Sequence, residues 1–144
     1  MRRLRKQLQR NWLWGVYTLF VAVAVSTHLN ANPNVSLFTS DGPYGMGKTI
    51  TWLILLAFLF YSINISRKED FFKSLNKMMQ ILWSRQVGLD LYVGLLVPLF
   101  IIYLHEGSLL VFALWVLPVL FFANLATFLY LALNYDSLVQ HFVL

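Results

Sequence analysis

Asp90 is the residue of this 144-residue chain whose type and position most directly suggest chemistry. It begins a long apolar segment, and a carboxylate inside a membrane costs about 2.5–3.5 kcal/mol on insertion scales, so such groups commonly serve ions, protons or ligands. Counting inward along neighbouring apolar segments at about 1.5 Å per residue brings Asn124 and Asn64 to a similar depth. The sequence therefore predicts a polar layer that comprises Asp90, Tyr92, Asn124, Asn64 and Ser62.

A structural interpretation of the same residues stays open. Asp90 follows Arg85 closely and falls in the first turn of its expected helix, where the helix dipole stabilises a carboxylate. Asn124 lies deeper in its segment, and an interhelical hydrogen bond of about 0.6 kcal/mol explains it without any activity.

A second polar group is expected at the opposite ends of the apolar segments. It contains His28, His105 and Glu106, with Asp41 in the nearby loop. Histidine and carboxylate are metal-ligand types, but nothing fixes these residues at ligand spacing. We therefore predict no metal site, and interpret the group as hydrogen-bonding side chains at helix ends.

Two prolines predict kinks at a similar depth in the last two apolar segments. Pro98 and Pro118 each remove one backbone hydrogen bond from a helix, and two kinks at one level can open a space between helices. A space with aromatic walls suits a lipid, quinone, isoprenoid or pigment, although kinks that merely improve packing are the competing interpretation. The candidate lining consists of Phe100, Tyr103, Phe112 and Trp115 with the two prolines.

Composition identifies the elements that must position these groups. The chain is 59% hydrophobic and 12% charged, about half the charged fraction of an ordinary soluble domain, which is roughly 25%. We expect one all-α domain over residues 1–144, an integral membrane four-helix bundle. Its spans are predicted at about residues 12–29, 50–65, 88–104 and 109–133.

Basic residues predict the orientation of these spans. All Lys and Arg except Lys48 lie before the first span or between the second and third. The positive-inside rule then puts both termini on the cytoplasmic or equivalent side. A cleaved signal peptide is the alternative for the first segment. Aromatic residues at its inner boundary, Trp12, Trp14 and Tyr17, favour a permanent helix instead.

Two connecting segments carry further signals. Residues 67–84 combine apolar and basic residues at helical spacing, which predicts an amphipathic helix in the inner interface, serving as a linker or as a docking surface for anionic lipid or a partner. Residues 42–49 match the P-loop pattern G-x-x-x-x-G-K-[ST]. A P-loop requires a preceding buried strand and a following soluble helix. Since neither is expected here, we predict a turn without nucleotide, with Lys48 snorkelling toward water.

The third and fourth apolar segments resemble an uncharacterised family of small plant and cyanobacterial-type membrane proteins, known only as a domain of unknown function. The likeness covers about residues 88–135. It consists of Asp90-Leu91-Tyr92 at a helix start, Glu106 at its far end, and Trp115 soon after. The resemblance implies a shared structural or binding role for Asp90, Tyr92 and Glu106, and implies no activity.

The sequence leaves three functions open. The first is a non-enzymatic module, either an accessory subunit or a binder of an apolar ligand, with the bilayer and a membrane protein or second copy as partners. The second is a small transporter or proton-handling protein that uses Asp90 and Asn124. A membrane enzyme for lipid or isoprenoid substrates ranks last, because its acidic residues do not cluster within a span. No cofactor is identified, and nothing indicates nucleic acid.

Overall fold

The computed structural model describes residues 1–143, with the side chains of residues 6–10 left out of the description. The described chain is all-helical and contains no strand. In chain order the helices are α1 (Arg2–Ala31), α2 (Met46–Lys68), α3 (Phe71–Met79), α4 (Leu82–Gly94), α5 (Leu96–Glu106), α6 (Leu109–Phe122), α7 (Asn124–Leu133) and α8 (Tyr135–Phe142).

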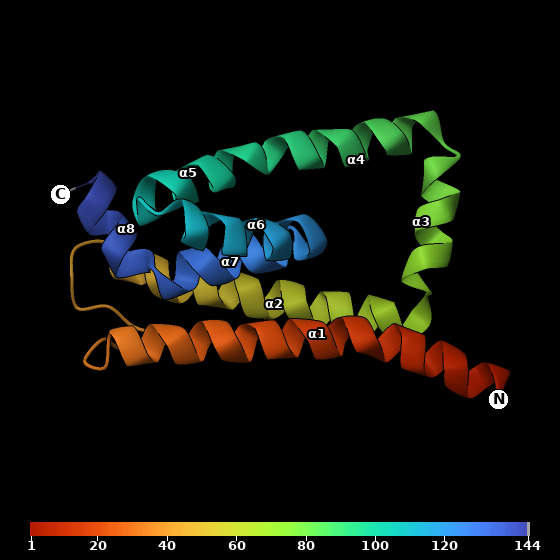
Figure 1. Cartoon of the computed structure of the whole chain (residues 1–144), viewed down its shortest axis with the longest axis horizontal. Helices are drawn as coiled ribbons and strands as arrows, with labels where there is room; N and C mark the ends of the chain where they lie inside the picture. The colour runs from red at the N-terminus through yellow and green to blue at the C-terminus, as the bar shows by residue number, and fades with distance from the viewer. Residues whose placement is uncertain (144) are drawn as a thin grey trace.

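Three long apolar units run along the longest axis of the molecule, namely α1, α2 and the pair α4–α5 (Figure 1). Their stretches Asn11–Ala31, Met46–Lys68 and Leu82–Glu106 are long and apolar enough to cross a membrane. The predictions of helices over residues 12–29, 50–65 and 88–104 are therefore confirmed. Between α4 and α5 the helix is interrupted at Leu95, just before Pro98, which cannot donate a backbone hydrogen bond.

The segment predicted as a fourth span is instead a helical hairpin. The chain reverses at Ala123, whose φ of 50° and ψ of −117° lie outside the helical region, so that α6 runs inward and α7 returns beside it (Figure 1). At about 1.5 Å per residue, α6 extends about 21 Å and α7 about 15 Å, short of the roughly 30 Å of a bilayer core. The prediction of one continuous helix over residues 109–133 is wrong because hydropathy does not register a reversal.

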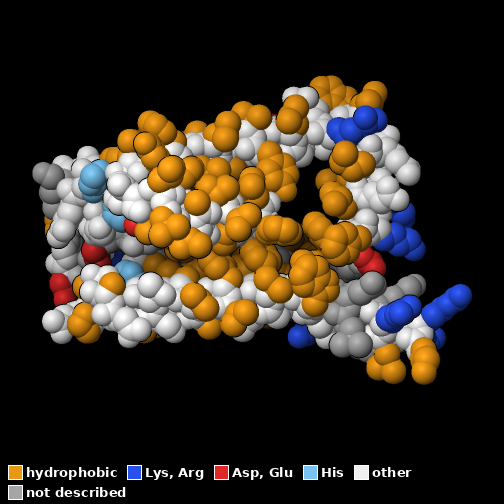
Figure 2. All heavy atoms as spheres, viewed as in Figure 1, with side chains coloured by type: hydrophobic (Ala, Val, Ile, Leu, Met, Phe, Trp, Pro, Cys, Tyr) orange, Lys and Arg blue, Asp and Glu red, His pale blue; other side chains and the backbone are white. Residues whose placement is uncertain are grey.

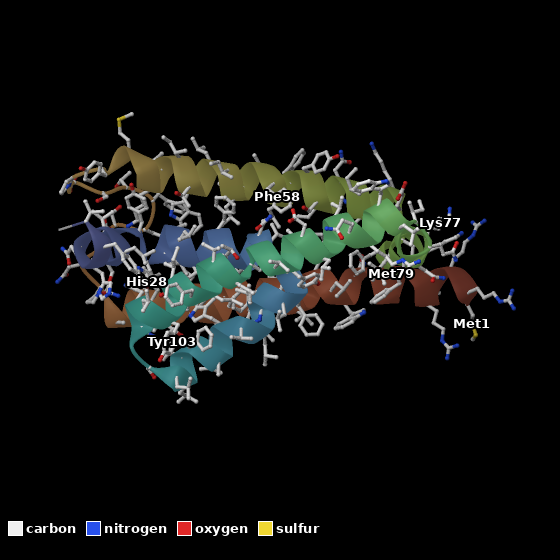
Figure 3. The ribbon with its side chains drawn as sticks, turned by 90° about the horizontal axis from the view of Figure 1, so that it is seen from above. Met1, His28, Phe58, Lys77, Met79 and Tyr103 are labelled. Carbon is white, nitrogen blue, oxygen red and sulfur yellow. The ribbon has the colours of Figure 1, made fainter. Side chains whose placement is uncertain are left out.

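Because of this hairpin, the N-terminus and the C-terminus lie at opposite ends of the molecule (Figure 1). Met1 lies with Lys77 and Met79 at one end of the molecule, whereas His28 and Tyr103 lie toward the other (Figure 3). We name these the α3 end and the α8 end after the short helix found at each. Because the hairpin returns to its starting side, α8 lies opposite the N-terminus (Figure 1). The two termini therefore lie at opposite ends of the molecule, whereas the sequence predicted them on one side of a membrane.

α3 crosses the α3 end roughly perpendicular to the long helices (Figure 1). Its first turn is capped by Asp70, whose carboxylate accepts hydrogen bonds from the backbone N–H of Phe72 at 3.0 Å and of Lys73 at 3.4 Å. The helix predicted over residues 67–84 is thus shorter, because residues 67 and 68 finish α2 and Leu82 already begins α4.

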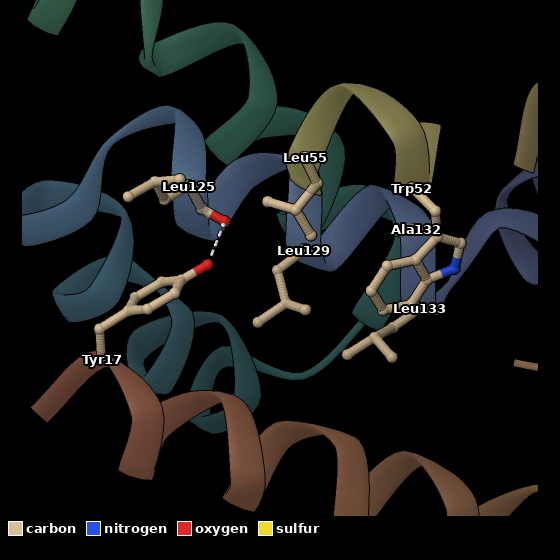
Figure 4. Packing of buried hydrophobic residues seen from close by; sticks show 7 residues of the cluster. All are labelled: Tyr17, Trp52, Leu55, Leu125, Leu129, Ala132 and Leu133. Carbon is tan, nitrogen blue, oxygen red and sulfur yellow. Dashed lines mark hydrogen bonds between the residues drawn. The ribbon is translucent and has the colours of Figure 1, made fainter. Parts of the chain in front are cut away.

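α7 is the most buried helix and forms the centre of the packing. One face meets α2 and α1 through a cluster of Tyr17, Trp52, Leu55, Leu125, Leu129, Ala132 and Leu133 (Figure 4). Its other face meets α5 and α6, where Tyr130 and Ala126 pack against Ile102 and Val119. The hairpin is therefore held between the long helices.

Gly47 offers a test of the packing of α8 against the start of α2. A Cβ at this position would lie 1.9 Å from the Tyr135 hydroxyl, which donates a 2.6 Å hydrogen bond to the Tyr44 carbonyl. Gly47→Ala should displace Tyr135 and lower the free energy of unfolding by about 1 kcal/mol or more through the lost hydrogen bond. Thermal unfolding in detergent measures the loss.

Gly88→Ala is the matched control, because nothing lies within 4 Å of a Cβ there. In the interior of α4, alanine favours the helix by about 1 kcal/mol relative to glycine. Equal unfolding temperatures for the two variants would contradict the close approach of Tyr135 to Gly47.

Candidate functional site

Four side chains at the α8 end form a continuous hydrogen-bonded chain, which we call the Ser137–Glu106 chain. The Ser137 hydroxyl lies 2.7 Å from His105 Nε2. His105 Nδ1 contacts the Tyr130 hydroxyl, which donates a 2.7 Å hydrogen bond to Glu106 Oε1. The carboxylate also lies 3.6 Å from His105 Nδ1. The chain thus joins α5, α7 and α8.

The donor pattern of this chain determines the tautomer of a neutral His105. Because the single Tyr130 proton goes to Glu106, the Tyr130 oxygen accepts, and His105 Nδ1 carries the proton that it accepts. The Nε2 lone pair then accepts the Ser137 hydroxyl proton. An imidazole with a free basic nitrogen against a hydroxyl, and with its other nitrogen fixed by an acceptor, is the arrangement of a general base.

Local structure holds each member in position. His105 and Glu106 occupy the last turn of α5, which ends at Gly107 with φ of 61°, a left-handed conformation that suits glycine. Tyr130 is completely buried on α7, and its ring packs edge-on against Trp115 with centroids 4.8 Å apart. Ser137 lies on the exposed face of α8. A buried relay therefore leads to an accessible hydroxyl.

A buried ion pair lies at the same end. The Lys48 ammonium is fully buried and lies 2.8 Å from Asp136 Oδ2, while it donates a 2.6 Å hydrogen bond to the Ser36 carbonyl. The Ser40 hydroxyl donates to the other Asp136 oxygen. Burial raises the pKa of Asp136, but the hydrogen bonds from Lys48 and Ser40 and the Lys48 charge outweigh it and hold this pKa below its ordinary value.

This pair decides the role of the P-loop-like segment, residues 42–49. Its lysine does not snorkel toward water, as the sequence suggested, but is enclosed by Ser36 and Asp136. Gly45 and Gly47 allow close approach, since a Cβ on either would overlap the Ser40 carbonyl or the Tyr135 hydroxyl. The segment therefore packs against α8 and binds its residues Tyr135 and Asp136.

The predicted polar layer is not joined by hydrogen bonds in the described part of the chain. Asp90 and Asn64 are exposed, and Ser62 and Asn124 are half-buried. Asp90 also lies beyond the first turn of its helix, because α4 already begins at Leu82. Tyr92 donates a 3.2 Å hydrogen bond to the Leu120 carbonyl and so ties α4 to the hairpin. Asn124 is the first residue after the reversal, so these residues belong to separate environments.

The residues predicted to line one apolar cavity also lie in separate places in the structure. Trp115 packs against Phe20 with ring centroids 5.4 Å apart, and Tyr103 packs against Phe112 at 5.5 Å. Phe100 is exposed on α5, and Pro98 is half-buried. Pro118 lines an apolar groove of about 210 Å³ between α1 and α6, with Trp12, Leu13, Val16, Phe20, Leu117, Phe121 and Phe122.

In the outer polar group the structure brings His105 and Glu106 together, and His28 lies near the Lys48–Asp136 pair. Among the described residues, no cluster of three His, Cys, Asp or Glu side chains could hold a metal ion. Sequence reasoning missed Tyr130, Ser137 and Asp136. No spacing signal could have found them, because Tyr130 lies on α7 and Ser137 and Asp136 on α8, and the break at Asn134 between these helices is not marked by a periodic pattern.

Comparison of the chain with protein-family models, curated proteins and solved structures gives no match. The resemblance of residues 88–135 to an uncharacterised membrane family therefore stays a prediction, and the functional argument depends on the geometry described above.

Removal of the Asp136 charge should destabilise the protein strongly. Asp136→Asn leaves the Lys48 ammonium buried without a counter-charge, and breaking a buried pair costs about 3–5 kcal/mol. Because Asp136 is a third exposed, we expect a loss near the lower limit, about 3 kcal/mol. Thermal unfolding in detergent measures it, with exposed Asp41→Asn as the matched control; equal losses would contradict a specific role for the pair.

The same pair predicts a dependence on pH. Since the pKa of Asp136 is depressed in the folded state, its stabilising contribution is complete above the ordinary value of 3.8 and disappears as the pH falls through the lower, folded-state pKa. The difference in unfolding temperature between the native protein and Asp136→Asn should therefore shrink on acidification. A difference that stays constant to about pH 2 would contradict this assignment.

Proposed function

We propose that the chain is an integral membrane protein that binds the hydrocarbon chain of an anionic lipid in the groove between α1 and α6. In this arrangement α1, α2 and α4–α5 cross the bilayer, and the α6–α7 hairpin enters from the α8 side and returns. This replaces the predicted four-helix bundle with three spans and a re-entrant hairpin. It keeps the apolar-ligand function that the sequence favoured.

The surface chemistry supports the membrane placement. Large hydrophobic side chains are exposed along all three long units, among them Leu19, Leu53 and Val97. Lys and Arg gather at the α3 end, and hydrophobic side chains cover the length between the two ends (Figure 2). By the positive-inside rule the α3 end faces the cytoplasm or its equivalent. α3 then lies in that interface, with Phe72 and Leu75 among its exposed apolar residues.

The groove itself carries the ligand proposal. Its lining is wholly apolar and comes from two elements, α1 and the proline-containing α6. Its volume of about 210 Å³ is below the roughly 300–1,000 Å³ of pockets that enclose a drug-sized ligand. Such a groove suits one linear hydrocarbon chain better than a fused-ring pigment or a quinone head. Figure 2 shows the surface hollowed beyond the hairpin tip, between α4 and the α1–α2 pair.

Basic residues near the groove favour an anionic head group. Trp12 is the groove residue closest to the N-terminus, and the exposed Arg5 lies seven residues earlier on α1, about 10 Å along the helix. Arg2 and Arg3 extend the positive surface further. A lipid whose tail follows the groove toward Pro118 therefore brings its head group to this cluster, where basic residues attract anionic head groups.

Filling the groove should reduce lipid capture. We expect Val16→Trp to lower crosslinking of a phosphatidylglycerol that carries a diazirine in its acyl chain at least about fivefold, because the indole occupies the volume of a bound chain segment. The measurement uses the full chain in nanodiscs, with crosslinked peptides identified by mass spectrometry. Val23→Trp makes the same change at an exposed α1 position outside the groove and should retain capture.

Equal capture by the two tryptophan variants would refute the groove as the binding site. A double variant, Arg3→Gln with Arg5→Gln, separates the head group from the tail. It should weaken capture of phosphatidylglycerol while leaving that of phosphatidylcholine unchanged, because only the former carries net negative charge.

The three-span arrangement has its own test. The chain contains no cysteine, so single cysteines introduced as Arg3→Cys and Gln140→Cys report their sides without background. A membrane-impermeant maleimide should label them from opposite faces, because α8 lies opposite the N-terminus. Gln80→Cys, at the end of α3, should behave like residue 3. Labelling of residues 3 and 140 from the same face would instead support four full crossings.

A further inference from the structure

The Ser137 hydroxyl is the most exposed member of the Ser137–Glu106 chain. Its neighbour His105 has a side chain only 8% exposed, and Tyr130 is fully buried. A hydrogen-bonded network that serves packing alone can end in any polar group. Here it ends in an accessible hydroxyl held at 2.7 Å from the basic nitrogen of an oriented imidazole, which is the geometry of an activated nucleophile.

We propose that Ser137 is the nucleophile of an acyl-transfer site that acts on a carboxylic ester at the membrane surface. His105 is the general base, and Glu106 and Tyr130 are positioning residues that keep its Nδ1 protonated and its Nε2 directed at Ser137. The arrangement has the roles of a serine–histidine–acid triad, recognised by geometry rather than by chain order, with a tyrosine inserted between base and acid.

The reaction follows from these positions. Ser137 Oγ attacks the ester carbonyl carbon while its proton passes to His105 Nε2. The C–O bond to the leaving alcohol then breaks, and the imidazolium returns that proton to the departing alkoxide. The product is an acyl ester on Ser137. A water deprotonated by His105 attacks its carbonyl carbon, the C–Oγ bond breaks, His105 returns the proton to Ser137 Oγ, and the acyl group leaves as a carboxylic acid. No oxidant, reductant or metal enters this balance.

The substrate class follows from the position of the site. Ser137 lies at the α8 end, where the long helices finish, and the apolar residues Phe142 and Val143 are exposed on the same terminal segment. In the membrane placement proposed above, this level is the boundary between hydrocarbon and water. The ester bonds of acyl lipids lie at that boundary. Only this choice of substrate depends on the proposed membrane placement; the reactivity of Ser137 does not.

Covalent capture tests the nucleophile before any substrate is known. The full chain in nanodiscs is treated with an alkyl fluorophosphonate and, separately, with the water-soluble 4-(2-aminoethyl)benzenesulfonyl fluoride. We expect an adduct on the peptide that contains Ser137 with both probes, and none in Ser137→Ala. The alkyl probe should react at least about tenfold faster if the site faces the membrane boundary. Equal rates would overturn the lipid class alone, and no adduct with either probe would overturn the whole proposal.

Two further variants distinguish catalysis from packing. His105→Gln should slow capture by about 100-fold, within the range of general-base contributions, whereas Ser108→Ala, at the start of α6, should leave it unchanged. Glu106→Gln should also slow capture, because a neutral amide holds the His105 tautomer less firmly. An adduct that forms at the native rate in His105→Gln would overturn the assignment of the base.

The pH profile of the native protein avoids any loss of folding in these variants. The ionisable groups that face His105 are Glu106 on its own helix, Tyr130 on α7 and His141 on α8, whose ring centroid is 5.8 Å away. Capture should rise as the pH is raised and the imidazole loses its proton, and then level off. A rate that does not change between about pH 4 and 8 would exclude His105 as the base.

Discussion

The arrangement of the C-terminal third depends on the buried ammonium of Lys48. A charge removed from water requires a close counter-charge, and Asp136 supplies it at 2.8 Å. Lys48 belongs to the first turn of α2, so Asp136 must come to that end of the molecule. The preceding segment starts from the same end, at Leu109, and can satisfy this only by going inward and returning. The hairpin, its reversal at Ala123 and the burial of α7 are all consistent with this one requirement.

The three long helices could be predicted because length and apolar composition alone define them. The hairpin could not, since residues 109–133 are as apolar as a span and contain the same number of residues whether they cross or return. Two features of that segment carried the missing information. Asn124 interrupts the apolar residues just past the midpoint, and Asp136 follows them as the carboxylate that reaches Lys48. Because Lys48 was expected to reach water, there was no reason in the sequence to look for an acidic partner.

The candidate sites show the same division between local and tertiary information. His105 and Glu106 could be recognised at a helix end from their types and positions. Their organisation could not, because Tyr130 and Ser137 come from helices whose direction depends on the hairpin. Asp90 shows the opposite case: its cost in lipid drew attention, yet it lies exposed in the second half of α4. The residue types identified candidate site residues, but the reversal of the chain at Ala123 determines which of these residues come into contact.

The reversal at Ala123 also constrains the order in which this protein is built. Neither α6 nor α7 is long enough to cross a bilayer core, and the tip between them leaves backbone groups that lipid cannot hydrogen-bond. In the proposed membrane placement, such a hairpin has no stable position until neighbouring helices surround it. In that placement the hairpin therefore enters the membrane after the first two thirds have assembled, and α1, α2 and α4–α5 provide the surfaces against which it packs.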